Sequence, residues 1–188
     1  MHDDEIKSLT AGPYTLVARW HQGSWTAAVW SGGEKIVTER TESLEAAWQF
    51  LIDWLGERVE EAARLRNGEA PSAEEARRAF CAISERLSDG QRKMLKAHLA
   101  APGHTLTASQ LASAAGYKGY SGANLQYGFV GALLVHEMPE ILPKRPDGTR
   151  IATCAIASAD DIRASNEEQW LWKMRPHIVQ GLKASGIV

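Results

Sequence analysis

Apolar and polar positions along the first forty residues follow the pattern of short strands. Residues 14–20, 25–30 and 35–38 are three runs rich in β-favouring side chains, and glycine lies in the links between them, as in hairpin loops. Over residues 44–59 the apolar positions instead recur at spacings of three and four, which indicates one buried helix face. We therefore predict a β-β-β-α unit over residues 1–68, a three-stranded antiparallel sheet with one helix.

The stretch Asn67–Pro71 is the predicted boundary, because glycine and proline interrupt helices and strands alike. Beyond it, Ser72, Ser88 and Thr107 each precede Glu or Gln by three residues, the pattern of a capping box at a helix start. Gly116 follows the third of these helices, where a left-handed residue is favoured.

A fourth helix is expected from Ser121 to about Glu137, with its inner face marked by Leu125, Phe129, Leu133 and His136. The end of the chain changes character again. It predicts a strand over Arg150–Ala157, a loop over Ala159–Asn166, a strand over Gln169–Met174 and a last helix over Pro176–Ala184.

This order of elements has a functional meaning. A helix, a short helix, a tight turn with glycine, a longer helix and two strands form the layout of a winged helix-turn-helix, whose second helix enters the major groove and reads base edges with its N-terminal residues. We therefore expect an α+β chain in which residues 72–188 form a helical, winged helix-turn-helix-like domain.

The residue types at the start of the fourth helix support this interpretation. Asn and Gln can bind adenine through two hydrogen bonds, while Lys and Ser suit phosphate. The predicted reading surface is Lys118, Tyr120, Ser121, Asn124, Gln126 and Tyr127, supported by Arg92, Lys93, Lys96, Lys144, Arg145 and Arg150. The competing interpretation is pure scaffold, because the later part of this helix is apolar nearly all round.

Two segments, AAGYKGYSGANLQYG (Ala114–Gly128) and EEQWLWKMRP (Glu167–Pro176), resemble a winged helix-turn-helix-like module of bacterial proteins associated with HNH endonucleases. The similarity covers roughly residues 90–188 and implies a DNA-associated accessory module. The chain departs from those proteins in having no recognisable HNH nuclease segment, so nuclease activity does not carry over.

Charge is unevenly distributed. Residues 1–70 hold 12 acidic and 7 basic residues, a net of −5, whereas residues 71–188 hold 11 acidic and 14 basic residues, a net of +3. The basic second half permits contact with nucleic acid without requiring it. The polar start MHDDEIK is unlike a signal peptide, and no apolar run reaches the ~20 residues that span a bilayer, so we expect a cytoplasmic protein without a membrane partner.

No catalytic constellation, metal site or cofactor is expected. The six histidines are scattered: His2, His21, His98, His104, His136 and His177. Two isolated cysteines, Cys81 and Cys154, supply no metal-ligand spacing. The acidic pair Asp160-Asp161 in a predicted loop offers too few ligands for a cation.

Two functions therefore remain open. The first is a non-enzymatic module of a mobile element or defence system that binds double-stranded DNA. The alternative is a protein-binding inhibitor or adaptor, such as a phage-encoded antagonist of a bacterial defence complex (an anti-CRISPR, for example). Such a protein would use the acidic helix of the N-terminal unit or its tryptophans, Trp20, Trp25, Trp30, Trp48 and Trp54. Exposed tryptophans would mark such an interface, whereas buried ones would form the core of the unit.

Overall fold

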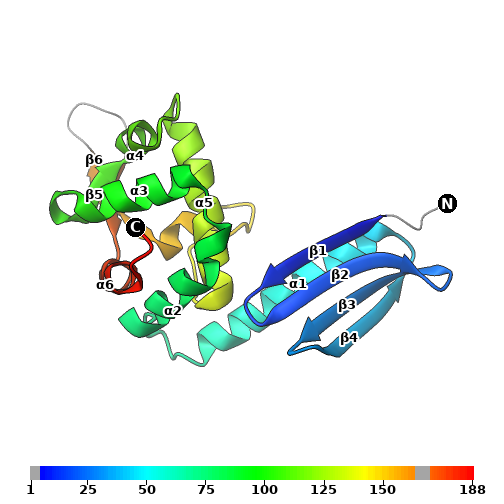
Figure 1. The fold of residues 1–188 in the computed structure, drawn as a ribbon. Coiled ribbons are helices and arrows are strands. Elements are labelled where there is room, and N and C mark those ends of the chain that lie inside the picture. The colour runs from blue at the N-terminus through cyan, green and yellow to red at the C-terminus, as the bar shows by residue number, and fades with distance from the viewer. Residues whose placement is uncertain (1–4, 164–169) are drawn as a thin grey trace. The chain divides into compact units, whose positions relative to one another are not determined.

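A computed structural model describes residues 5–163 and 170–188 of the chain and divides it into two compact units, residues 1–65 and 66–188 (Figure 1). The α+β class expected from the sequence is confirmed. None of the helices in the described ranges is long and apolar enough to cross a membrane.

The N-terminal unit contains a four-stranded antiparallel sheet in the order β1-β2-β3-β4. Its strands are β1 (Ile6–Ala11), β2 (Tyr14–His21), β3 (Ser24–Ser31) and β4 (Glu34–Thr41). The predicted three strands therefore fall one short, because β1 pairs with β2 along its whole length. The apolar pattern did not predict β1, because β1 is an edge strand in which only Ala11 is fully buried.

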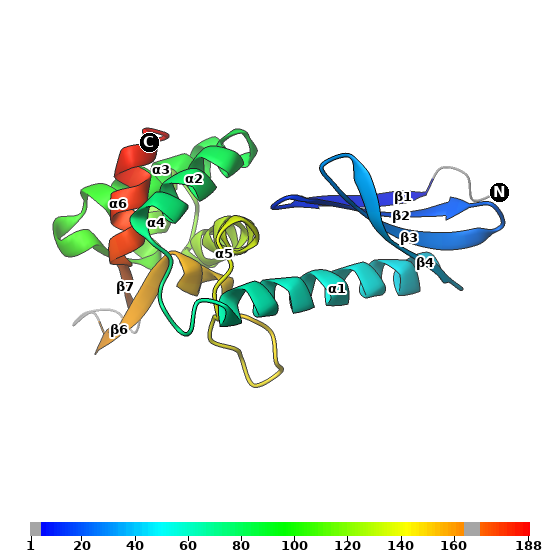
Figure 2. The ribbon, with the colours of Figure 1, turned by 90° about the horizontal axis from the view of Figure 1, so that it is seen from below.

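Helix α1 (Leu44–Arg64) covers one face of this sheet (Figure 2). Ser43 starts the helix, since its hydroxyl accepts a hydrogen bond from the Ala46 amide at 3.0 Å. Cross-strand neighbours such as Leu16 and Val29 are fully buried together with Leu51 of the helix. Each such side chain contributes roughly 1.5–3 kcal/mol on burial.

Most tryptophans of this unit belong to its core. Trp25 is 7% exposed, Trp20 meets it edge-on at 5.6 Å between ring centroids, and Trp54 meets Tyr14 edge-on at 5.0 Å. Trp30 is the exception, with 36% of its surface exposed. The tryptophans therefore form no broad exposed cluster.

The C-terminal unit combines helices with a three-stranded antiparallel sheet in the order β5-β7-β6. Its helices are α2 (Ala73–Ile83), α3 (Asp89–Ala100), α4 (Ala108–Ala115), α5 (Tyr120–Glu137) and α6 (Pro176–Ser185). Its strands are β5 (Thr105–Thr107), β6 (Ala157–Arg163) and β7 (Trp170–Met174), and 3₁₀ turns lie at Ser84–Arg86 (η1), Pro102–His104 (η2) and Ala152–Ala155 (η3).

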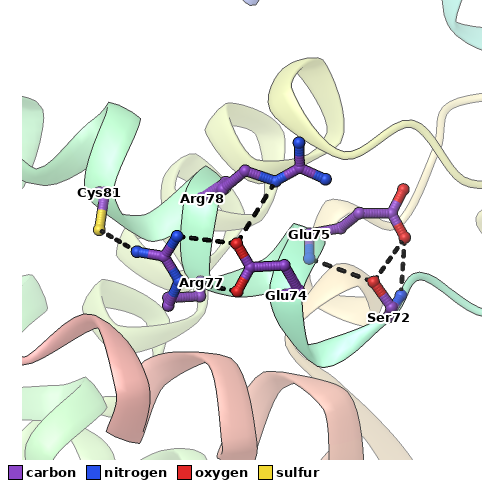
Figure 3. Close-up of polar contacts among 6 residues, drawn as sticks. All are labelled: Ser72, Glu74, Glu75, Arg77, Arg78 and Cys81. Carbon is purple, nitrogen blue, oxygen red and sulfur yellow. Dashed lines mark hydrogen bonds and ion pairs between the residues drawn. The ribbon is translucent and has the colours of Figure 1, made fainter.

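The predicted capping boxes are present at Ser72, Ser88 and Thr107. In the first (Figure 3), the Ser72 hydroxyl accepts a hydrogen bond from the Glu75 amide at 3.2 Å, and the Glu75 carboxylate accepts one from the Ser72 amide at 2.9 Å. Arg66 also pairs with this carboxylate at 2.6 Å, and its hydrogen bond is the main reason why the pKa of Glu75 falls to about 2.

One core holds the C-terminal unit together. Phe80, Ile83, Met94, Leu95, Tyr127, Ile156 and Ile178 are among its fully buried members. Gly181 lets α6 approach α2 closely, because a Cβ atom at this position would lie 2.5 Å from the Cβ of Ala76. This contact fixes the end of the chain against the start of the unit.

The predicted strand Arg150–Ala157 is wrong over most of its length. Residues 152–155 form η3, and β6 begins at Ala157 and runs through the first part of the expected loop Ala159–Asn166. η3 packs against α5 at Gly131, where a Cβ atom would lie only 2.0 Å from the Ala152 carbonyl oxygen. Residues 164–166 of that expected loop, and Gln169 of the expected strand Gln169–Met174, lie outside the described residues.

Candidate nucleic-acid interface

The turn between α4 and α5 places the first predicted contact residues on the surface. Gly116 ends α4 in the left-handed conformation (φ 75°), which glycine adopts without steric cost. Gly119 then precedes α5 with no side chain capping the helix start. Lys118, Tyr120 and Ser121 are exposed at this point, and Asn124 is exposed one turn later.

Tyr127 was expected on the reading surface and instead lies in the core. It is 1% exposed, and its hydroxyl lies 2.8 Å from Nδ1 of His98. The buried row of α5 contains Ala123, Tyr127, Val130 and Leu134, so helical geometry places Tyr127 on the side away from solvent. It therefore cannot touch nucleic acid in this structure.

Gln126 is also engaged within the protein. Its side-chain oxygen accepts a hydrogen bond from Nε2 of Gln91 at 2.9 Å. Gln91 is itself 6% exposed and completes the capping box of α3. Gln126 is half-buried as a result, and its role here is to tie α5 to the start of α3.

The exposed face of α5 is more apolar than expected. Leu125 and Phe129, which the sequence placed on the inner face, are 57% and 52% exposed. Because α5 carries apolar residues nearly all round, hydrophobic periodicity could not distinguish its inner face from its outer face.

A groove of about 420 Å³ runs beside this face. It brings the predicted contact residue Asn124 together with Arg145 and Arg150, which come from the segment between α5 and β6. The remaining lining residues are Leu125, Gly128, Phe129, Ala152 and Thr153. The groove thus joins an amide, two cations and two large apolar side chains.

The loop that carries the two arginines is closed on itself. Lys144 and Arg150 form an antiparallel bridge, and the Arg145 amide donates to the Thr149 carbonyl at 2.8 Å. Asp147 accepts hydrogen bonds from the Thr149 hydroxyl and amide, which hold the pKa of the Asp147 carboxyl below its usual value. Local bonding therefore closes this charged loop on itself.

The predicted basic residues of α3 differ in their roles. Arg92 is half-buried, and its guanidinium donates to the carbonyl oxygens of Ile187 and Ser84. It is therefore a structural link between α3 and the chain end. Lys93 and Lys96 are exposed, but neither lines the groove.

Several titratable groups of this unit are buried, and the guanidinium groups of Arg66 and Arg175 act on both Glu140 and His177. Burial lowers the pKa values of His98, His136 and His177, the last two to about 4. Glu140 is paired with Arg175, and burial raises the pKa of this carboxyl.

No group of three or more His, Cys, Asp or Glu side chains that could hold a metal ion occurs within residues 5–163 and 170–188. Asp160 and Asp161, expected in a loop, lie on β6.

Among the groove residues, sequence reasoning missed Leu125 and Phe129 as surface residues, and it did not single out Gly128, Ala152 or Thr153. The apolar spacing gave no signal that could have identified this pair, because α5 is apolar nearly all round and its pattern favours no face. Comparison of the chain with protein-family models, with curated proteins and with solved structures found no match.

Proposed function

We propose that the C-terminal unit is a non-enzymatic module that binds double-stranded DNA as a winged helix-turn-helix. The groove that joins Asn124 of α5 to Arg145 and Arg150 is the observation that carries the proposal. These residues come from separate segments, yet they line one surface and offer the amide and guanidinium groups that bases and phosphates bind.

The order of elements supports the same assignment. α3, β5, α4, α5, β6 and β7 follow one another, and the short first strand pairs with the last one in the order β5-β7-β6. In this proposal α5 is the reading helix and the turn before it carries Lys118. The strands β6 and β7 would belong to the wing.

Each group on the proposed surface has a defined task. The Asn124 amide would read an adenine edge, and Arg145 and Arg150 would position the phosphate backbone. Leu125 and Phe129 supply the apolar contact that a thymine methyl group favours. α5 has no acidic residue in its first turn, so its start does not repel phosphate.

The experiment is fluorescence anisotropy of the full chain with a labelled duplex at two salt concentrations. Asn124→Ala and Arg145→Ala are each expected to weaken binding roughly tenfold or more, and Arg145→Ala should also lower the salt slope by about one. Lys183→Ala removes an exposed cation from α6 and serves as the control with the same charge change. Absence of duplex binding at low salt would refute the proposal.

One observation favours a protein partner as the second candidate function. Leu125 and Phe129 are both more than half exposed on one helix face, as anchors of a protein interface often are. Loss of partner capture in Phe129→Ala, together with no duplex binding by the parent chain, would select this alternative.

A further inference from the structure

The face of the N-terminal sheet opposite α1 has a distinct composition. Side chains that pair across neighbouring strands share a face, so the registers define three rows on this side. They are Ile6–Arg19–Thr26–Arg40, Ser8–Val17–Ala28–Thr38 and Thr10–Thr15–Trp30–Lys35. We call these twelve residues the open face, and each of them is exposed or half-buried.

Charge on the open face has a single sign. Its three cations are Arg19, Lys35 and Arg40, and none of its twelve residues is acidic. Glu34 and Glu39 of β4 pair with Ser31 and Ala27, which places both carboxylates on the side of α1. Although residues 1–70 have a net charge of −5, this face is positive.

The described carboxylates do not neutralise these positive charges. The described part of the chain contains no carboxylate within ion-pair distance of Arg19, Lys35 or Arg40. Arg19 and Arg40 lie in one row on either side of Thr26, so the two strands that carry them are about 10 Å apart. Lys35 lies in the row of Trp30, which is four residues along β3 from the row of Thr26, so the two rows are about 13 Å apart.

Trp30 adds an aromatic surface to the same face. It is 36% exposed, and the Lys35 ammonium lies over its ring, 5.8 Å from the centroid. The row beside it has only small or hydroxyl-bearing side chains apart from Val17. The open face thus has an aromatic ring beside a row of mostly small side chains, and cations lie in both of the outer rows.

These features favour single-stranded nucleic acid as the ligand of the open face over a duplex or a second copy of the chain. An aromatic ring beside cations is the combination that binds bases by stacking and their backbone by charge. A four-stranded sheet spans about 14 Å between its outer strands, which exceeds the ~12 Å width of a DNA major groove. A second copy of the same face would bring like charges together.

We propose that the open face binds single-stranded nucleic acid, with a base stacked on Trp30 in place of the Lys35 ammonium and the backbone following Arg19, Arg40 and Lys35. This site lies in the other unit from the proposed duplex interface and does not depend on it.

The test measures anisotropy of a labelled fifteen-nucleotide oligothymidylate with the full chain. Trp30→Ala is expected to weaken binding roughly five- to 150-fold, the range for one lost base–aromatic stack. The double variant Arg19→Ala/Arg40→Ala should weaken binding at least tenfold and reduce its salt dependence.

Two other exposed cations supply a control with the same change in charge. Lys7 pairs with Ala18, whose side chain is buried beneath α1, and Arg64 lies on α1. Lys7→Ala/Arg64→Ala is therefore expected to bind the oligonucleotide within about twofold of the parent chain, apart from a uniform long-range charge effect.

Three results would overturn the proposal. The first is unchanged oligonucleotide binding in Trp30→Ala and in the double arginine variant. The second is equal displacement of the probe by a duplex of the same sequence. The third is a dimer in light scattering that Trp30→Ala dissociates, since the face would then be occupied by a second copy. Binding that survives Arg145→Ala and Asn124→Ala but not Trp30→Ala supports it, whatever becomes of the duplex interface.

Discussion

Replacing Tyr127 by Phe tests a fully buried polar contact of the C-terminal unit. His98 is fully buried, with Nδ1 2.8 Å from the Tyr127 hydroxyl and Nε2 2.8 Å from the Trp172 carbonyl oxygen. Because a carbonyl oxygen can only accept, Nε2 must carry the proton of the neutral ring. Nδ1 is then the acceptor, and the Tyr127 hydroxyl donates to it.

The variant leaves this acceptor buried without a partner. Phe preserves the ring and its packing, so the main loss is the hydrogen bond together with the desolvation of Nδ1, about 1–3 kcal/mol. The equilibrium constant for unfolding should therefore rise roughly five- to 150-fold. Tyr120→Phe removes the same hydroxyl from a side chain that is 51% exposed on the same helix, and it should cost less than about 0.5 kcal/mol.

Urea titration followed by far-ultraviolet circular dichroism at pH 8 measures both variants with His98 neutral in the folded and unfolded chain. Nitrogen NMR of the imidazole provides an independent check, since it should report a proton on Nε2 of His98. Equal stability of the two variants would refute the reasoning, and so would a proton on Nδ1. Equal stability would mean that Tyr127 is held in the core by packing alone, whereas a proton on Nδ1 would mean that His98 donates to the Tyr127 hydroxyl.

Two further predictions concern packing and acid stability. Gly131→Ala should destabilise the chain by about 1–3 kcal/mol, because its new methyl group would meet the Ala152 carbonyl. Gly128→Ala, which meets nothing within 4 Å, should instead stabilise α5 by up to about 1 kcal/mol, and urea midpoints that move the two variants in the same direction would contradict this. Burial lowers the pKa values of His136 and His177 to about 4, below the ~6.5 of the unfolded chain. Stability should therefore be full above pH 6.5 and fall as the pH drops to about 4, by on the order of 3 kcal/mol per histidine. A urea midpoint that stays constant between pH 7 and pH 5 would contradict this assignment.

Helix starts could be predicted well because their chemistry is local. Ser72, Ser88 and Thr107 each satisfy an amide of their own first turn, so a tetrapeptide is sufficient to identify them. The same holds for Gly116, whose left-handed conformation ends α4. These signals depend on neighbours within four residues and therefore do not depend on tertiary contacts.

The faces of α5 could not be predicted, because the helix has no clear polar side. Leu125 and Phe129 were expected inside and Tyr127 outside, and the structure reverses these assignments. What decides the orientation is nonlocal: Tyr127 reaches His98 of α3, and Gly131 admits η3. The local spacing of apolar residues predicts neither contact.

The open face shows why strand register matters more than composition for the charge of a surface. Residues 1–70 are acidic in sum, which by itself argues against a site for an anionic polymer. Register reverses this conclusion, because it places Arg19 and Arg40 in one row and directs Glu34 and Glu39 to the other side of the sheet. A shift of one residue in the pairing of β4 would exchange those faces. The charge of the open face is therefore a property of strand pairing and cannot be obtained by counting residues.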